Sequence, residues 1–208
     1  MQVAAGSDGS KDFRQAELDR HVEAMSRFIA RHADAAPPRC TLVLRSAASA
    51  PARALMHMKD ALVSAGVRAT VILAKLEPQD DLRQLFATLS ELAPEAEGAA
   101  LIRWARNPRL LDAHEQVTYG GTMCWSGDAM RRDADKRNPL VLFDMDAPDA
   151  ALRAHHAFKA LWGASVPVPA HHLSARRPAK PSGAYGQAAN APVTALRPQV
   201  GGWPLVRH

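Results

Sequence analysis

The sequence predicts an α/β protein, with a layered mixed sheet flanked by helices and then a tail without regular structure. Short, apolar, β-branched segments alternate with segments whose apolar residues recur at helical spacing, which is typical of layered α/β domains. Near residue 165 the composition changes to proline, alanine and glycine without apolar periodicity, as in disordered chains. We therefore expect a flexible start over residues 1–10, one α/β domain over 11–164 and a disordered tail over 165–208.

The first half of the domain predicts two helices that alternate with two strands. Ser10 suits the N-cap of the first helix, and the proline pair in "APPRC" ends it, because proline cannot continue a helix. Gly66 suits the left-handed residue that ends the second helix. A strand–helix–strand unit of this kind makes parallel neighbours with a right-handed crossover. The expected elements are a helix at 11–31, a strand at 40–47, a helix at 53–64 and a strand at 67–75.

The second half continues this alternation. Asp80 and Asp81 fall in the first turn of the third predicted helix, where the helix dipole favours negative charge. Short β-branched segments then predict three more strands before a final helix that carries "AFKALW". The expected elements are a helix at 79–93, strands at 98–105, 117–119 and 139–145, and a helix at 148–163.

The stretch "YGGTMCWSGDAMRR" is the first candidate for binding chemistry. We expect a glycine turn after a strand and then a short helix over "WSGDAMRR". Backbone N–H groups and the Thr122 hydroxyl at such a helix N-terminus would attract an anion. The glycine patterns GxxxxGK[ST] and GxGxxG are absent, which excludes the common nucleotide fingerprints. The alternative is a glycine turn with a structural role only.

Metal and thiol chemistry have less support. No HExxH motif or Cys/His cluster exists, so we expect no metal and no cofactor. Cys124 follows His114 and Asp112 in the chain, so His114 and Cys124 are weak catalytic candidates, and the alternative for the cysteine is a small buried filler. Two isolated cysteines, no secretory signal and no apolar run long enough to span a bilayer predict a cytoplasmic protein.

Positive charge gathers at the C-terminal end. The net charge is +5, yet the last acidic residue is Asp149, and the seven lysines and arginines after it leave the first 149 residues at −2. This asymmetry predicts a tail that contacts a protein partner, a nucleic acid or an anionic surface, and the alternative is a solvated tail. The residues proposed for partner binding are Arg176, Arg177, Trp203 and Leu205.

The order of several short motifs resembles one half of a phospholipase D-like domain. Such a half has a strand–helix–strand unit, a strand with the pattern HxKxxxxD, a G-[ST]-x-N turn often continued as W-[ST]-G-x-A, and a helix ending in F-x-x-L-W. The matching stretches lie within residues 40–163 and are "MKDALVSAGVRATVILA", "GTMCWSGDAM", "RN", "PLVLF" and "AFKALW".

The resemblance also implies that the family's chemistry is missing. Its HxKxxxxD pattern falls at 107–114, where Asn107 replaces the nucleophilic His, Arg109 the Lys and His114 the Asp. An amide is not a nucleophile, whereas Arg109 can still hold a phosphate in a bidentate manner.

In the turn that follows the pattern, Gly121 and Thr122 keep the glycine–hydroxyl pair, but Cys124 replaces the Asn. The resemblance therefore implies an anion site made of Asn107, Arg109, Gly121 and Thr122.

Three functions remain open after the sequence. The first is a non-catalytic binding or scaffold protein on a degenerate phospholipase D-like fold, with a tail that docks a partner. The second is a phosphodiesterase or nuclease that uses His114 or Cys124 and acts as a homodimer, because the chain holds one half-domain and the family needs two motifs. The third is nucleic-acid binding through the basic tail, which would depend strongly on salt.

Overall fold

A computed structural model describes residues 8–31, 38–131 and 142–174, which form a single layered α/β unit. Seven strands form one mixed sheet in the order β6-β5-β4-β1-β2-β3-β7. The three central strands β1, β2 and β3 run parallel, and every other pair is antiparallel. The strands are β1 (Arg39–Leu44), β2 (Arg68–Leu73), β3 (Ile102–Trp104), β4 (His114–Tyr119), β5 (Met123–Ala129), β6 (Leu142–Asp144) and β7 (Val166–Pro167). The predicted fold class, a mixed sheet flanked by helices, is confirmed.

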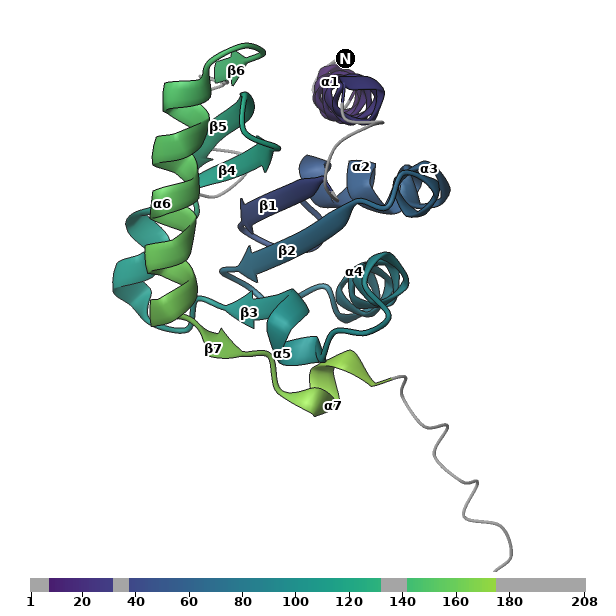
Figure 1. The fold of residues 1–208 in the computed structure, drawn as a ribbon. Helices are drawn as coiled ribbons and strands as arrows, with labels where there is room; N and C mark the ends of the chain where they lie inside the picture. Colours follow the sequence, from purple (N-terminus) through teal and green to yellow (C-terminus); the bar gives the residue numbers. More distant parts are fainter. Residues whose placement is uncertain (1–7, 32–37, 132–141, 175–208) are drawn as a thin grey trace, which may run out of the picture. The chain divides into compact units, whose positions relative to one another are not determined.

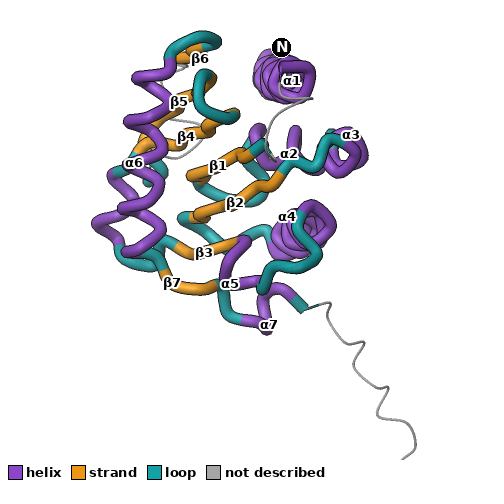
Figure 2. The backbone as a smooth tube through the Cα atoms, in the orientation of Figure 1, coloured by secondary structure: helices purple, strands orange, loops and turns teal. Residues whose placement is uncertain are grey.

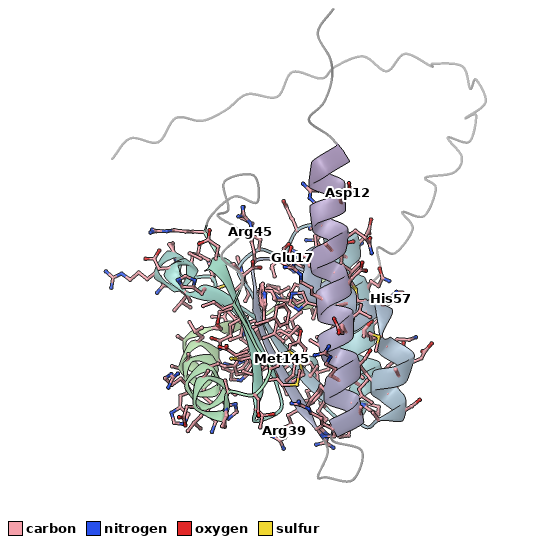
Figure 3. The ribbon with its side chains drawn as sticks, turned by 90° about the horizontal axis from the view of Figure 1, so that it is seen from above. Asp12, Glu17, Arg39, Arg45, His57 and Met145 are labelled. Carbon is pink, nitrogen blue, oxygen red and sulfur yellow. The ribbon has the colours of Figure 1, made fainter. Side chains whose placement is uncertain are left out.

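Helices cover both faces of the sheet. Figure 1 shows α1 to α4 on one face and α6 on the other, and α1 extends beyond the sheet at the end that carries Asp12 (Figure 3). The helices are α1 (Asp8–Arg31), α2 (Ala50–His57), α3 (Lys59–Ser64), α4 (Gln79–Leu92), α5 (Gly98–Leu101), α6 (Pro148–Ala164), α7 (Ala170–Leu173) and the 3-10 helix η1 (Pro108–Asp112). None of the helices within these ranges is both long and apolar enough to cross a bilayer.

The central strands are apolar on both faces, which explains why the sequence shows continuous apolar runs there rather than alternation. Leu42 and Leu44 of β1 belong to the larger core, which includes residues of α1, α2 and α4. Val43 and Ile72 belong to the smaller core on the other face, with Phe158 of α6. Residues with odd numbers on β1 and residues with even numbers on β2 therefore point their side chains towards α6.

Four elements differ from the sequence-based expectation. The strand expected at 98–105 begins as a helix, α5, and only its second half is strand β3. The helix expected at 53–64 is two helices that meet at Met58, whose backbone is not helical (φ −89°, ψ 9°). The helix expected over "WSGDAMRR" is wrong, because residues 125–129 belong to strand β5, as Figure 2 shows. The domain also extends past the expected boundary at residue 164, since β7 and α7 follow, and Val168 joins the larger core.

The antiparallel pairing of β4 with β1 gives the sheet two distinct ends. Tyr119 pairs with Cys40 near the start of β1, whereas His114 lies near the end of β1. We call the end where β1, β2 and β3 finish the carboxyl edge, and the end where they begin the amino edge. Arg45 and Arg39 mark these two ends in Figure 3.

Candidate anion-binding site

The four residues predicted to form one anion site do not come together. Asn107 and Arg109 lie at the start of η1, which follows β3 at the carboxyl edge. Gly121 and Thr122 lie in the turn between β4 and β5 at the amino edge. Strand β4 separates the two pairs, and its five residue steps correspond to about 17 Å. The single site built on the register 107–114 is therefore wrong.

The helix N-terminus predicted beside the glycine turn is not there. Gly120 adopts a left-handed backbone (φ 68°) in a turn between two strands, so no helix N-terminus is available to bind an anion there. The carbonyl of Thr122 accepts a hydrogen bond from the backbone N–H of Ala147 at 2.8 Å, which ties the turn to the start of α6. This bond gives the turn a structural role, which is the alternative that the sequence left open.

His114 lies at the carboxyl edge beside an irregularity in the sheet. His114 pairs with Ala129 and Gln116 with Ser126, so β5 has one more residue than β4 in this interval. Such a bulge often redirects a side chain or a carbonyl beside a functional site. Here the carbonyl oxygen of Gly127 lies 2.8 Å from Nδ1 of His114. A carbonyl can only accept, so Nδ1 carries the proton, and Nε2 of the neutral ring keeps its lone pair.

Gly127 is required at this position because Trp125 lies against it. A Cβ atom at Gly127 would lie 2.6 Å from Cη2 of the Trp125 indole, which is closer than any real contact. Trp125 is buried and packs edge-on against His21 of α1, with ring centroids 4.8 Å apart. The indole thus links the α1 side of the core to the bulge that orients His114.

Basic residues line the carboxyl edge, with one at each of five adjacent strands. Arg131 follows β5, His114 begins β4, Arg45 follows β1, Lys75 follows β2 and Arg106 follows β3. All except Arg45 are exposed. At the usual spacing of strands, four intervals correspond to a row about 19 Å long.

Three basic residues at this edge are not neutralised within the part of the chain that the structure describes. Arg131 pairs with Asp112 at 2.8 Å, whereas Lys75, Arg106 and Arg109 form no ion pair among the described residues. The Arg106 guanidinium lies 5.8 Å from the centroid of the Trp104 ring. Three exposed cations at one end of the sheet can therefore contact an external anion.

A buried carboxylate, Glu115, supports this edge from the opposite face of β4, and the sequence analysis missed it. Glu115 is 1% exposed, and its Oε1 accepts from the backbone N–H of Arg45 at 2.7 Å and from the Ser49 hydroxyl at 2.9 Å. These bonds hold the turn from β1 to α2. The sequence signal is a charged residue that alternates with Val117 and Tyr119 and so falls on the inward face of the strand.

Cys124 does not meet the other catalytic candidates. It pairs with Thr118, five residues along β5 from Ala129, the partner of His114. Burial first, and then the charge of Asp144, raise the pKa of Cys124, which disfavours the nucleophilic thiolate. Cys124 is the buried filler that the sequence left open as the alternative.

The predicted partner-binding residues lie in the tail. Arg176, Arg177, Trp203 and Leu205 lie outside the described residues. Within residues 8–31, 38–131 and 142–174, no three His, Cys, Asp or Glu side chains gather to hold a metal ion. Comparisons with models of known protein families, with curated proteins and with solved structures find no match to this chain.

Proposed function

We propose that this chain is a non-catalytic binding protein whose carboxyl edge holds an extended anion. The observation that carries the proposal is the row of basic residues at the ends of five adjacent strands. Ligands of open α/β sheets bind outside the carboxyl ends of the strands, where loops present their side chains. A row about 19 Å long favours a linear polyanion over a single small ion.

Lys75, Arg106 and Arg109 are the residues that would hold this ligand. They are exposed and form no ion pair in the described part of the chain, so binding need not break an existing bridge. Arg109 offers a bidentate guanidinium fork, and Lys75 offers a point charge on a flexible stem. His114 adds a neutral acceptor or, when protonated, a further charge.

The resemblance to a phospholipase D-like half stays part of the proposal, but we now align the family pattern with strand β4 and not with residues 107–114. The family pattern HxKxxxxD needs its first and third residues on one face of a strand, and η1 does not offer this at 107–114. On β4 the same spacing gives His114, Gln116 and Gly121. The imidazole is then in place, while the Lys and the Asp are missing.

Gln116, at the position of the family's Lys, favours a binding function over a catalytic one. Its Nε2 donates to the backbone carbonyl of Ala154 in α6 at 2.6 Å, so the amide is engaged with the helix. An amide also cannot supply the positive charge that a phosphate transition state needs. Gly121, at the eighth position, has no side chain to replace the family's Asp.

A phosphodiesterase is the second candidate, because of the hydrogen bond between His114 and Gly127. The bond leaves the Nε2 lone pair available to attack phosphorus. Hydrolysis of bis(p-nitrophenyl) phosphate by the wild type and by His114→Ala tests this candidate. A wild-type rate no higher than that of the variant eliminates it.

Binding of inorganic tripolyphosphate tests the main proposal. We expect saturable binding that weakens as salt increases, and a loss of about tenfold for Arg106→Gln, in line with removal of one charge-assisted contact. Arg53→Gln, on α2, is the matched control for loss of one arginine and should change the affinity less than twofold. Equal effects of Arg106→Gln and Arg53→Gln would contradict a site at the carboxyl edge.

The role of the tail and the state of assembly are part of the same proposal. We propose that the basic tail binds a partner protein or a nucleic acid, and that two chains associate in the cytoplasm. Truncation after Ser174 should abolish the tail's interactions and leave tripolyphosphate binding unchanged.

Light scattering of the eluted full chain tests the association of two chains. One chain has a mass of 22.5 kDa, and the measured mass should be twice this value.

A further inference from the structure

A second cluster of basic residues lies at the amino edge, on the face covered by α6. Arg39 and Arg68 are directly paired in register at the starts of β1 and β2. The alternation along the strands places both on the α6 face, because Val43 and Ile72, an even number of residues further along, pack with α6. Like charges in register on neighbouring strands destabilise a sheet unless something compensates them.

Helix α6 adds further basic residues to the same place. Ala151, His155, Phe158 and Trp162 recur at helical spacing, and Ala151 and Phe158 are buried, so His155 lies on the sheet-facing side of α6. Lys159 is one turn after His155 and is exposed. Together, β1, β2 and α6 bring Arg39, Arg68, His155 and Lys159 to one end of the sheet.

Little negative charge opposes this cluster in the described part of the chain. Arg68 pairs with Glu95 at 2.6 Å, but both side chains are about half exposed (48% and 56%), and such surface pairs contribute little. Arg39, His155 and Lys159 form no ion pair among the described residues. On the neighbouring strands β5 and β6, Asp144 raises and Arg153 lowers the pKa of Cys124, so a carboxylate and an arginine both act on that thiol.

The titration of His155 is consistent with this geometry. Burial first, and then the charges of Lys159, His156 and Arg39, lower the pKa of His155 from 6.5. The three neighbouring charges act in the same direction, as expected for basic residues that β1 and α6 bring together. An anion among them would act in the opposite direction and favour the imidazolium.

We propose that Arg39, His155 and Lys159, with Arg68 beside them, form a second anion site, which takes a dianionic oxyanion such as a phosphate monoester or sulfate. The site lies at the opposite end of the sheet from the carboxyl edge, so it does not depend on the function proposed above. Because binding favours the protonated form of His155, affinity increases as the pH falls.

Titration of the full chain with sulfate tests the site, because sulfate stays dianionic from pH 7.5 to pH 5.0, so a change in affinity comes from titration of the protein and not of the ligand. We expect saturable binding at constant ionic strength, about tenfold tighter at pH 5.0, which corresponds to a shift of one unit in the pKa of His155. The imidazole proton signals of His155 should show the same upward pKa shift when sulfate is added.

Variants separate the site from general attraction to a basic protein. His155→Asn should abolish the pH dependence, and Lys159→Gln should weaken binding at least fivefold at both pH values. Arg153→Gln on the same helix and Arg53→Gln on α2 should each change the sulfate affinity less than twofold. Circular dichroism checks that each variant is folded.

Two results would overturn the proposal. One is a sulfate response that does not saturate or that equals the response to chloride. The other is a pH dependence that persists in His155→Asn. Parallel titrations with inorganic phosphate and glycerol 1-phosphate distinguish a free phosphate from an esterified one, and saturable binding of either supports the site.

Discussion

The carbonyl oxygen of Gly127 lies 2.8 Å from Nδ1 of His114, across a bulge between β5 and β4. This contact fixes which nitrogen of His114 carries the proton, and the bulge that makes it depends on a glycine packed against Trp125. The orientation of an exposed histidine at the carboxyl edge is thus set by a buried indole. Four predictions follow from this arrangement and from its neighbours.

Gly127→Ala should destabilise the protein by about 1–3 kcal/mol, because the new methyl group overlaps the buried Trp125 ring and the core must shift. Urea unfolding measures the loss. Gly121→Ala is the control, since a Cβ atom there meets nothing within 4 Å, and it should change stability by less than about 0.5 kcal/mol. Equal stability of the two variants would contradict the packing of Trp125 on Gly127.

Stability should fall in acid because of His21. Its ring is fully buried and hydrogen-bonded to the Tyr119 hydroxyl at 2.8 Å, and burial lowers the pKa of His21 from 6.5 to about 3. The unfolded state binds the proton more readily, so this stabilisation is complete above pH 6.5 and is lost as the pH falls towards 3. At pH 5 the loss is about 2 kcal/mol.

Denaturant unfolding between pH 7.5 and pH 5 measures this dependence. His21→Asn should have a flatter pH profile than the wild type, although it is less stable at neutral pH. His57→Asn should keep the wild-type slope, because His57 is exposed on α2. A wild-type slope retained in His21→Asn would assign the acid sensitivity to other groups.

Glu115→Ala should cost about 1–3 kcal/mol, because the backbone N–H of Arg45 and the Ser49 hydroxyl lose a buried charged acceptor. Thermal unfolding at neutral pH measures the change. Glu97→Ala removes an exposed carboxylate whose side chain makes no cap hydrogen bond, so it should leave the melting temperature nearly unchanged. Similar melting temperatures for both variants would refute the role of Glu115 in the turn from β1 to α2.

Both cysteines should react slowly with thiol reagents in the native protein. Burial raises the pKa of Cys40 from 9.0 to about 12, so its thiolate is roughly a thousandfold scarcer at neutral pH. The pKa of Cys124 is raised as well, first by burial. Labelling with a chromogenic disulfide should accelerate strongly in denaturant for both Cys40→Ser and Cys124→Ser. In Cys40→Ser the remaining cysteine is Cys124, and its rapid labelling in the native protein would show that Cys124 is a reactive thiol.

The sequence by itself determined the alternation of strands and helices and hence the mixed α/β class. The apolar run in "TLVLRSA" and the helical spacing of Leu82, Leu85 and Leu89 are local patterns. Such patterns identify an element when it forms mainly because a strand is buried on both faces or a helix along one stripe. The nature of "WSGDAM" was not determined in this way. Tryptophan favours a strand, alanine favours a helix and glycine favours neither, so the composition is ambiguous and pairing with β4 decides the structure.

Only the tertiary structure decided which candidate residues share a site. Asn107 and Thr122 are close in sequence, yet β4 carries them to opposite ends of the sheet. Arg39 and Arg68 are 29 positions apart, yet parallel pairing puts them side by side. Hydrogen bonding between strands sets these distances, and no single-chain periodicity records which strands become neighbours or in which register they pair.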